Sequence, residues 1–177
     1  MKKTYTSAFT LIELIIYVTI LSLFVGALSN FYINIRHSTV RTDVASEIQH
    51  SAHLALHRIT QDVRAADTLV TATGNTLAVS TLGTTTTFTT IERTVTIGGE
   101  DVTITVLQRT VGAGTPEDLT SNNISVTNFT VENRTRGSER PNVKILLTIE
   151  YENPGTDINR NRSLSLETAI SLRSEPL

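Results

Sequence analysis

The sequence predicts an α+β fold, in which one long N-terminal α-helix packs with its second half on an antiparallel β-sheet. Apolar residues fill 19 of the 27 positions from Phe9 to Ile35. From Val44 to Ala66, apolar residues recur every three or four positions, which is the spacing of one helix face. From about Leu69 the period changes to two, and threonine, which favours strands, occurs 31 times in the chain.

The composition excludes several classes of function. The chain has 177 residues, the length of one ordinary domain. With 15 Lys+Arg and 17 Asp+Glu, its formal charge of -2 predicts no nucleic-acid contact. There is no cysteine, which excludes disulfides, thiolate metal sites and cysteine nucleophiles. Because tryptophan is absent and aromatic residues make up 5%, a base-stacking surface is not expected either.

The apolar segment from Phe9 to Ile35 has the length of a membrane-spanning helix. As a helix it would be about 40 Å long, which exceeds the roughly 30 Å thickness of a bilayer core. Lys2 and Lys3 precede it and indicate a cytoplasmic N-terminal end under the positive-inside rule. Arg36 and Arg41 follow it, so this orientation signal is weak.

Glu13 is the only formal charge inside this segment, and a charge at the bilayer centre costs roughly 3 kcal/mol. Three interpretations are open. Thr10 and Glu13 fit the capping box of a helix start. The segment fits an ordinary secretory signal, cut after the small residues Ala27 and Ser29. In the third interpretation, Glu13 meets a specific cationic partner within the membrane.

The order of residues from Ala8 to Leu14 is a small residue, then Phe-Thr-Leu-Ile-Glu-Leu, ahead of a long apolar run. It resembles the class III leader of type IV pilins and pseudopilins. In that family a prepilin peptidase cuts before the phenylalanine, and the new N-terminus is methylated. The resemblance implies cleavage between Ala8 and Phe9 and N-methylation of Phe9. Ala8 stands where the family usually has glycine. The resemblance also implies that Glu13 meets the amino group of Phe9 on a neighbouring subunit in a helix bundle.

We therefore expect four parts in the chain. Residues 1–8 form a cytoplasmic leader peptide, and residues 9–35 form the transmembrane and filament-core helix. Residues 36–68 continue this helix in amphipathic form, and residues 69–177 form an extracytoplasmic β-rich domain. No proline occurs before Pro116, so a single helix from Phe9 to Ala66 is expected, with Gly26 and Ser29 as candidate flexible points.

His50, His53 and His57 share one face of this helix, which makes a metal site conceivable. No carboxylate or cysteine completes a set of ligands at suitable spacing, so we favour a solvated polar face beside Asp62 and Arg64. No metal and no cofactor is predicted.

Several strands are expected after Leu69. We predict an exposed strand at Thr84–Thr90 and a loop at Gly112–Thr120. A hairpin is expected around Gly98-Gly99, with Val95, Ile97, Val102, Ile104 and Val106 facing the core. Another strand spans Ile124 to Val131 with an irregularity near Asn128. Clean alternation predicts an antiparallel pair of strands, 143–151 and 164–172, joined by the loop Glu152–Arg162.

The segment Ala55–Ala66 and the order of the later elements are similar, more distantly, to the minor pilins of the W type and to pseudopilin J. In that subfamily the subunits are scarce, lie at or near the filament tip and help to start assembly.

Other motifs favour solvated surface. Asp157–Asn161 matches the first half of a calcium loop, but Arg162 occupies the glycine position and Glu167 falls one residue short of the bidentate position. The pairs Glu100-Asp101 and Glu117-Asp118 are read as solvated carboxylates in turns. No catalytic residue set is found, so an enzyme is not expected.

The function expected from the sequence is a minor subunit of a type IV filament, either a pilus or a type II secretion pseudopilus. Its expected partners are other pilin-like subunits, the prepilin peptidase, the inner-membrane assembly platform and the membrane. It would be a single-pass cytoplasmic membrane protein before assembly and part of an extracytoplasmic filament afterwards. The alternatives are a pseudopilin of a DNA-uptake system and, from another class, a membrane-anchored ligand-binding β-domain with an ordinary signal sequence.

Overall fold

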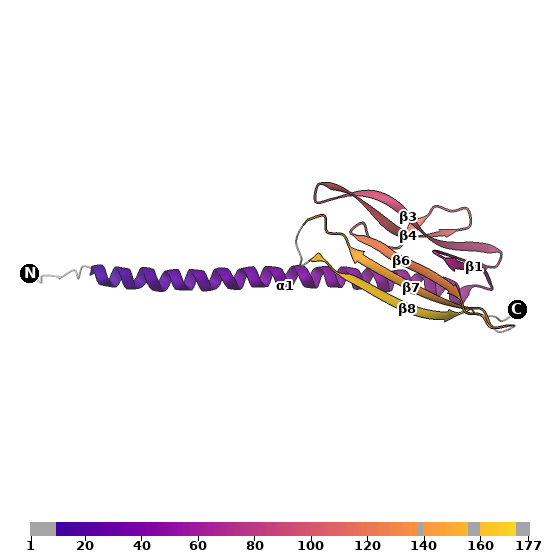
Figure 1. Ribbon diagram of the computed structural model, residues 1–177, viewed down its shortest axis with the longest axis horizontal. Coiled ribbons are helices and arrows are strands. Elements are labelled where there is room, and N and C mark those ends of the chain that lie inside the picture. The colour runs from indigo at the N-terminus through magenta and orange to yellow at the C-terminus, as the bar shows by residue number, and fades with distance from the viewer. Residues whose placement is uncertain (1–9, 138–139, 156–159, 173–177) are drawn as a thin grey trace, which may run out of the picture. The chain divides into compact units, whose positions relative to one another are not determined.

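The computed structural model describes residues 10–137, 140–155 and 160–172. The chain forms two compact units, residues 1–40 and residues 41–177. One helix, α1 (Leu11–Ala65), supplies the described part of the first unit and the helical layer of the second (Figure 1). Gly26 and Ser29 lie inside it with helical backbone. The predicted single long helix is therefore confirmed over these residues.

The second unit combines α1 with one curled, antiparallel sheet of 8 strands, which confirms the predicted α+β class. The strands follow the order β5-β4-β3-β2-β1-β6-β7-β8 across the sheet (Figure 1). Their bounds are β1 (Thr68–Gly74), β2 (Thr76–Thr81), β3 (Thr84–Ile97), β4 (Glu100–Val111), β5 (Glu117–Asp118), β6 (Ile124–Asn133), β7 (Asn142–Tyr151) and β8 (Ser163–Ser171).

The apolar stripe of the helix lies against the sheet and forms half of the core. All seven of its members are at most 5% exposed: Val44, Ile48, Ala52, Ala55, Ile59, Val63 and Ala66. The inward side chains of β7 are fully buried opposite this layer: Val143, Ile145, Leu147 and Ile149. Each Ile, Leu or Val buried in this way contributes about 1.5–3 kcal/mol relative to an exposed side chain. The small alanines in the stripe let the helix lie close to the sheet.

The pairing of β7 with β8 confirms the predicted antiparallel pair, with Val143 opposite Ile170 and Ile149 opposite Leu164. The irregularity expected near Asn128 is also present, because the β6–β7 register shifts between Val126 and Asn128. An extra residue in one strand moves the alternation to the other face. As a result, both Val126 and Phe129 are buried.

The prediction of an exposed strand at Thr84–Thr90 is wrong in its burial. These residues begin β3, and Thr86 and Phe88 are buried, with Phe88 fully so. Phe88 lies opposite Arg109 of β4 and Leu77 of β2, in the interior of the sheet. A threonine-rich strand still has an inward face, because alternate side chains point to opposite sides.

The hairpin around Gly98 and Gly99 is confirmed, with both glycines at positive φ, but its predicted core face is only partly right. Ile104 and Val106 are buried, whereas Val95, Ile97 and Val102 near the tip are only half-buried. The loop predicted at Gly112–Thr120 contains the short strand β5, which pairs with β4 through Gln108 and Arg109.

Candidate functional site

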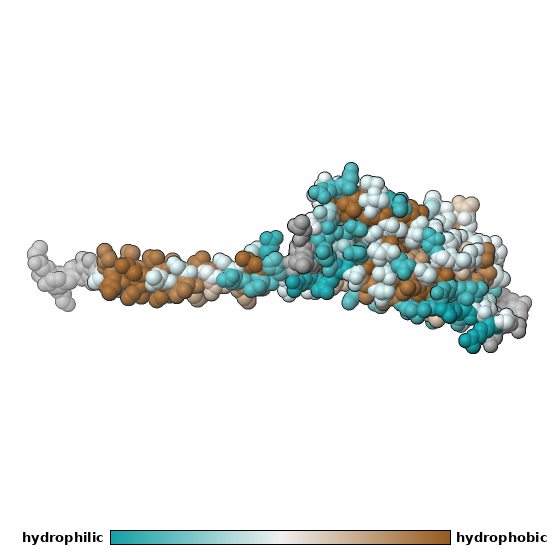
Figure 2. All heavy atoms as spheres, viewed as in Figure 1, coloured by the Kyte–Doolittle hydropathy of each residue, from teal (hydrophilic) through white to brown (hydrophobic). Residues whose placement is uncertain are grey.

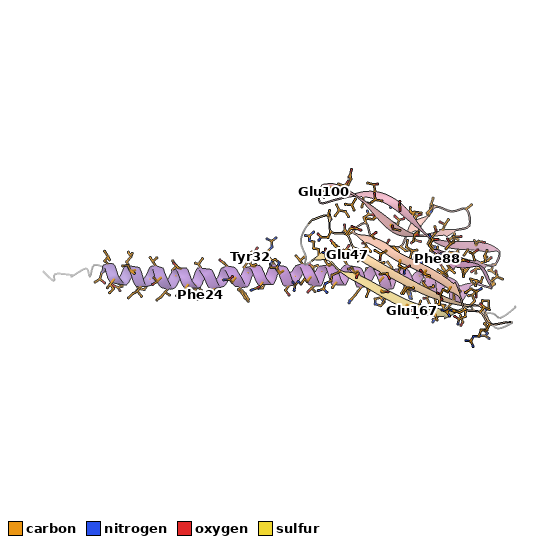
Figure 3. The ribbon with its side chains drawn as sticks, viewed as in Figure 1. Phe24, Tyr32, Glu47, Phe88, Glu100 and Glu167 are labelled. Carbon is orange, nitrogen blue, oxygen red and sulfur yellow. The ribbon has the colours of Figure 1, made fainter. Side chains whose placement is uncertain are left out.

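In the described part of the first unit, the helix exposes apolar side chains on all of its sides. Its large apolar side chains, from Leu11 to Ile35, are between 47% and 78% exposed. Figure 2 shows this surface as an almost continuous hydrophobic band, and Figure 3 shows Phe24 and Tyr32 pointing outward from the helix. By length and composition, this helix is able to cross a membrane. Since soluble proteins rarely expose apolar patches larger than a few hundred Å², this surface is suited to contact with lipid or with other protein chains.

Polar side chains within this segment bond back to the helix. The hydroxyl of Thr19 donates to the carbonyls of Ile15 and Ile16 at 2.9 and 2.8 Å. Ser22, Ser29 and Asn30 donate in the same way to carbonyls four residues earlier. A hydroxyl paired within its own helix adds little to the cost of an apolar environment. The segment therefore remains apolar on its outside despite these residues.

Glu13 differs from these polar residues because its carboxylate is charged. Its backbone N–H donates to the hydroxyl of Thr10 at 3.4 Å, and the N–H of Leu14 donates to the Thr10 carbonyl at 3.2 Å. Thr10 therefore serves as the N-cap, which fits half of the capping box. The Glu13 carboxylate itself has no hydrogen bond or ion pair with another described residue. The predicted cleavage and methylation residues, Ala8 and Phe9, lie outside the described part of the chain.

A cluster of ion pairs ties the helix to the sheet in the second unit. Arg109 of β4 donates from Nε to Asp62 Oδ2 at 2.6 Å and from Nη2 to Asp62 Oδ1 at 3.2 Å. Its Nη1 also reaches Glu117 Oε2 at 3.4 Å, and Arg58 lies 3.9 Å from the same oxygen. Asp62 was predicted to be solvated, but it is half-buried and paired. Glu117, predicted as a solvated carboxylate in a turn, lies instead in β5 and is paired, although its side chain remains 53% exposed.

Asp118 forms a second centre beside this cluster. Its carboxylate accepts hydrogen bonds from both Nη atoms of Arg93, at 2.5 and 3.1 Å, and from Gln108 Nε2 at 2.8 Å. The hydrogen bonds from Arg93 hold the pKa of Asp118 below its usual value, although partial burial opposes the shift. The hydrogen bond to Asp62 likewise raises the pKa of Arg109. These ion pairs and hydrogen bonds hold β5 against β3, β4 and the helix. Each charged side chain in the cluster lies beside one of opposite charge.

Glu47 anchors the other end of the packed helix. Its Oε1 accepts hydrogen bonds from Ser121 Oγ at 3.2 Å and Asn123 Nδ2 at 3.3 Å, in the segment before β6. Glu47 and Asp62 both flank the apolar stripe (Figure 3 labels Glu47). The helix is thus fixed to the sheet by two carboxylates as well as by its buried stripe.

The predicted metal-binding candidates are not assembled into a site among the described residues. His50, His53 and His57 are all exposed on α1. Within residues 10–137, 140–155 and 160–172, no three His, Asp or Glu side chains are grouped to hold an ion. Asp157 and Asn159 of the calcium-loop candidate lie outside these ranges. Asn161 accepts a hydrogen bond from Asn153 at 2.8 Å.

Sequence reasoning missed the pairing of Asp62 with Arg109, which lie 47 positions apart. No local pattern identifies such partners. Hydrophobic periodicity predicts on which face of a helix or strand a residue lies, but not which distant residue it contacts. β8 is the last strand of the sheet, and none of the described residues pairs with its outer side. Sequence reasoning did not identify this open edge, although Ser163–Ser171 contains one charge and no proline.

Comparison with known proteins gives one positive result. Residues 3–29 match the model of the prokaryotic N-terminal methylation motif. This range contains Ala8, Phe9 and Glu13 and overlaps the exposed apolar part of α1. The match supports a type IV pilin-like subunit that is processed by a prepilin peptidase. The chain matches no curated protein and no solved structure.

Proposed function

We propose that the protein is a minor subunit of a type IV filament, either a pilus or a type II secretion pseudopilus, that helps to start assembly at or near the tip. The observation that carries this proposal is the methylation motif at residues 3–29, which overlaps a helical segment whose large apolar side chains from Leu11 to Ile35 are exposed. A motif of this kind associates the chain with other pilin subunits in general. The distant similarity to W-type minor pilins and pseudopilin J supports the minor role.

In the proposed mechanism, the chain is held in the cytoplasmic membrane by the helix from Phe9 to about Ile35. The prepilin peptidase cuts between Ala8 and Phe9, and the amino group of Phe9 is methylated. The helix then exchanges lipid contacts for contacts with like helices. Because lipid is as apolar as these side chains, packing and polar pairing must direct the association.

Glu13 supplies the polar pairing in this mechanism. Its carboxylate has no partner among the described residues. In an apolar bundle, an unpaired carboxylate costs several kcal/mol, which a nearby cation offsets. The amino group of Phe9 on a neighbouring subunit is the cation we propose. Only one axial offset between two helices brings these groups together, so the pair sets the register of assembly.

The first experiment is the intact mass and N-terminal sequence of the protein purified from its native membrane. A start at singly methylated Phe9 is the expected result. A start near Asn30 would instead identify an ordinary secreted domain, and an uncut Met1 would indicate a membrane anchor. In the uncut case, Ala8→Gly decides whether Ala8 merely made the leader a poor substrate.

The second experiment separates assembly from folding. Glu13→Gln is expected to leave processing and the unfolding of the second unit unchanged and to reduce the amount of protein recovered in sheared filaments. Thr19→Val, which changes a polar residue bonded within its own helix, is the matched control and is expected to incorporate normally. Normal incorporation of Glu13→Gln contradicts the register role. The ratio of this subunit to the main filament protein tests the minor role, since a tip subunit must be scarce.

A further inference from the structure

The strand β8 leaves one long edge of the sheet open. At the opposite end of the sheet, β5 pairs with β4, the Leu119 N–H donates to the Leu107 carbonyl at 2.8 Å, and the Thr105 N–H donates to Ser125 Oγ at 3.1 Å. On β8, by contrast, no described residue pairs with the side facing away from β7. The two edges of the sheet therefore differ: backbone groups at the β4 edge are paired, whereas those on the outer side of β8 have no described partner.

The register identifies the backbone groups on the open side of β8. The N–H of Tyr151 donates to the Arg162 carbonyl, and the N–H of Leu172 donates to the Pro141 carbonyl. Hydrogen-bonded and open positions alternate in an antiparallel ladder. The backbone N–H and C=O groups of the even-numbered residues of β8 are therefore directed toward β7. The odd-numbered residues direct N–H and C=O outward: Ser163, Ser165, Glu167, Ala169 and Ser171.

Of the features that usually block an exposed edge, β8 carries only one charged side chain, Glu167. Natural edge strands are protected by lysine, proline, bulges or short length. β8 is 9 residues long, has no lysine or proline, and pairs with β7 without a register shift. Its single charge, Glu167, is bound by Lys144 of β7 at 3.0 Å (Glu167 is labelled in Figure 3). Such an edge is a template for an added strand.

At this edge, apolar side chains of the core remain partly exposed. The inward side chains of β7 are fully buried, from Val143 to Ile149. On β8, Ile170 is buried, but Leu164 and Leu166 are only half-buried. An added strand with apolar residues beside these leucines would extend the core by one row.

The end of β8 near Ala169 borders a cationic hollow. This hollow has a volume of about 890 Å³ and is lined by Arg134, Arg136, Arg140, Asn142, Lys144, Ala169 and Ser171. Figure 2 shows hydrophilic surface at this end of β7 and β8. Arg134 pairs with Glu132 and Lys144 with Glu167, whereas Arg136 and Arg140 form no ion pair with a described residue. Counting only the residues that the structure describes, two outward-directed backbone positions thus lie beside an excess of positive charge.

We propose that the β8 edge docks an extended acidic segment of a partner protein, which adds to the sheet as an antiparallel strand. Backbone groups of Ser163 to Ser171 supply the hydrogen bonds. Apolar residues of the segment lie beside Leu164 and Leu166. Its carboxylates lie opposite Ala169 and Ser171, in the hollow with Arg136 and Arg140. This charge complementarity selects an acidic segment over a second copy of β8, whose Glu167 residues would repel one another in a symmetric pair.

The probe for this proposal is a labelled synthetic peptide of the length of β8, Glu-Val-Glu-Val-Lys-Val-Thr-Val-Thr. Antiparallel alignment places its two glutamates opposite Ser171 and Ala169 and its lysine opposite Glu167. Binding is measured by fluorescence anisotropy on the full-length protein in detergent micelles. Hydrogen exchange of the β8 amides is measured in parallel, because only strand addition protects the outward N–H groups. We expect saturable binding, protection of β8, and no binding of a scrambled peptide.

Two substitutions at one position distinguish binding by strand addition from binding by electrostatic attraction alone. Ala169→Pro removes an outward N–H without removing a β7–β8 hydrogen bond, since Ala169 faces the open edge. Binding is expected to weaken by at least about tenfold. Ala169→Thr keeps the N–H and suits a strand, so it is the matched control and should bind normally.

A charge reversal gives a second test that does not depend on the folding of the proline variant. Arg140→Glu is expected to weaken binding of the glutamate peptide and to favour a peptide with lysine at both glutamate positions. Arg162→Glu, at the other end of β8, should not reverse this preference.

Three results would overturn the proposal. They are the absence of binding to the native protein, equal binding to Ala169→Pro and Ala169→Thr with both folded, and binding without protection of the β8 amides. Self-association of the protein through β8, detected by the same exchange pattern without peptide, would identify a second copy as the occupant and also contradict the acidic partner.

Discussion

Arg109 of β4 and Asp62 of α1 form a two-point ion pair, with N–O distances of 2.6 and 3.2 Å. Their side chains are 18% and 20% exposed, so water screens the pair only partly. The planar guanidinium matches the two carboxylate oxygens, which gives the contact a defined direction as well as energy. This pair fixes the rotation of the helix on the sheet, which the buried apolar stripe alone specifies less sharply.

Arg109→Ala is expected to lower the free energy of unfolding by about 1–3 kcal/mol, because it leaves Asp62 partly buried without its donor. Urea unfolding of the full-length protein in detergent measures this change. Asp62→Ala combined with Arg109→Ala should cost less than the sum of the two single changes, since both remove one interaction. Arg162→Ala, at an exposed position, is the control and should stay within about 0.5 kcal/mol of the native protein. Additive costs would show that the pair has no coupling energy.

Asp118 should make stability depend on pH in the acid range. Arg93 lowers the pKa of Asp118 in the folded protein below the unfolded value. The pair therefore contributes stability above the unfolded pKa, which is about 4, and this contribution is lost as pH falls through the folded pKa.

The measurement is the urea midpoint of native protein and Asp118→Asn across this range. The two proteins should differ most at neutral pH and converge at low pH. Asp43→Asn, at an exposed position of α1, serves as the control. A constant difference between native protein and Asp118→Asn at every pH would refute the assignment.

Phe88 should be a major contributor to stability despite its threonine-rich surroundings. Its side chain is fully buried, and replacing a buried phenylalanine with alanine removes apolar contacts and leaves a cavity. We expect Phe88→Ala to reduce the free energy of unfolding by about 3–5 kcal/mol. Leu82→Ala, where the native side chain is 84% exposed, should change it by less than about 0.5 kcal/mol. Similar effects of the two variants would contradict the burial of Phe88.

Leu82 offers a stabilising change. It lies in the tight turn between β2 and β3 and has a φ of 49°, followed by Gly83 at 78°. A left-handed backbone conformation costs leucine roughly 1–2 kcal/mol, whereas asparagine before glycine is favoured in such a turn. Leu82→Asn is expected to raise the thermal midpoint by a few degrees. An unchanged or lower midpoint would indicate that the Leu82 side chain has favourable contacts in the folded protein.

Local sequence patterns determined much of the architecture. The spacing from Val44 to Ala66 identified the buried apolar positions of the stripe but not the buried Ser51, because a helix repeats every 3.6 residues and the pattern was followed through apolar residues alone. The alternation in β7 and β8 identified their pairing, and the broken alternation near Asn128 identified the bulge. The order from Ala8 to Leu14 predicted the motif that residues 3–29 match. Each of these features depends on residues that are neighbours in the chain.

Tertiary structure decided the contacts between distant segments. Asp62 meets Arg109, and Glu117 and Asp118 form β5, because the curled sheet brings β4 and β5 to the helix flank. Val95, Ile97 and Val102 alternate as well as Ile104 does, yet they are only half-buried, because they lie near the tip of the long hairpin. The open side of β8 likewise follows from its place as the last strand in the sheet. Periodicity states which face of an element is apolar, and only the packed chain determines what covers that face.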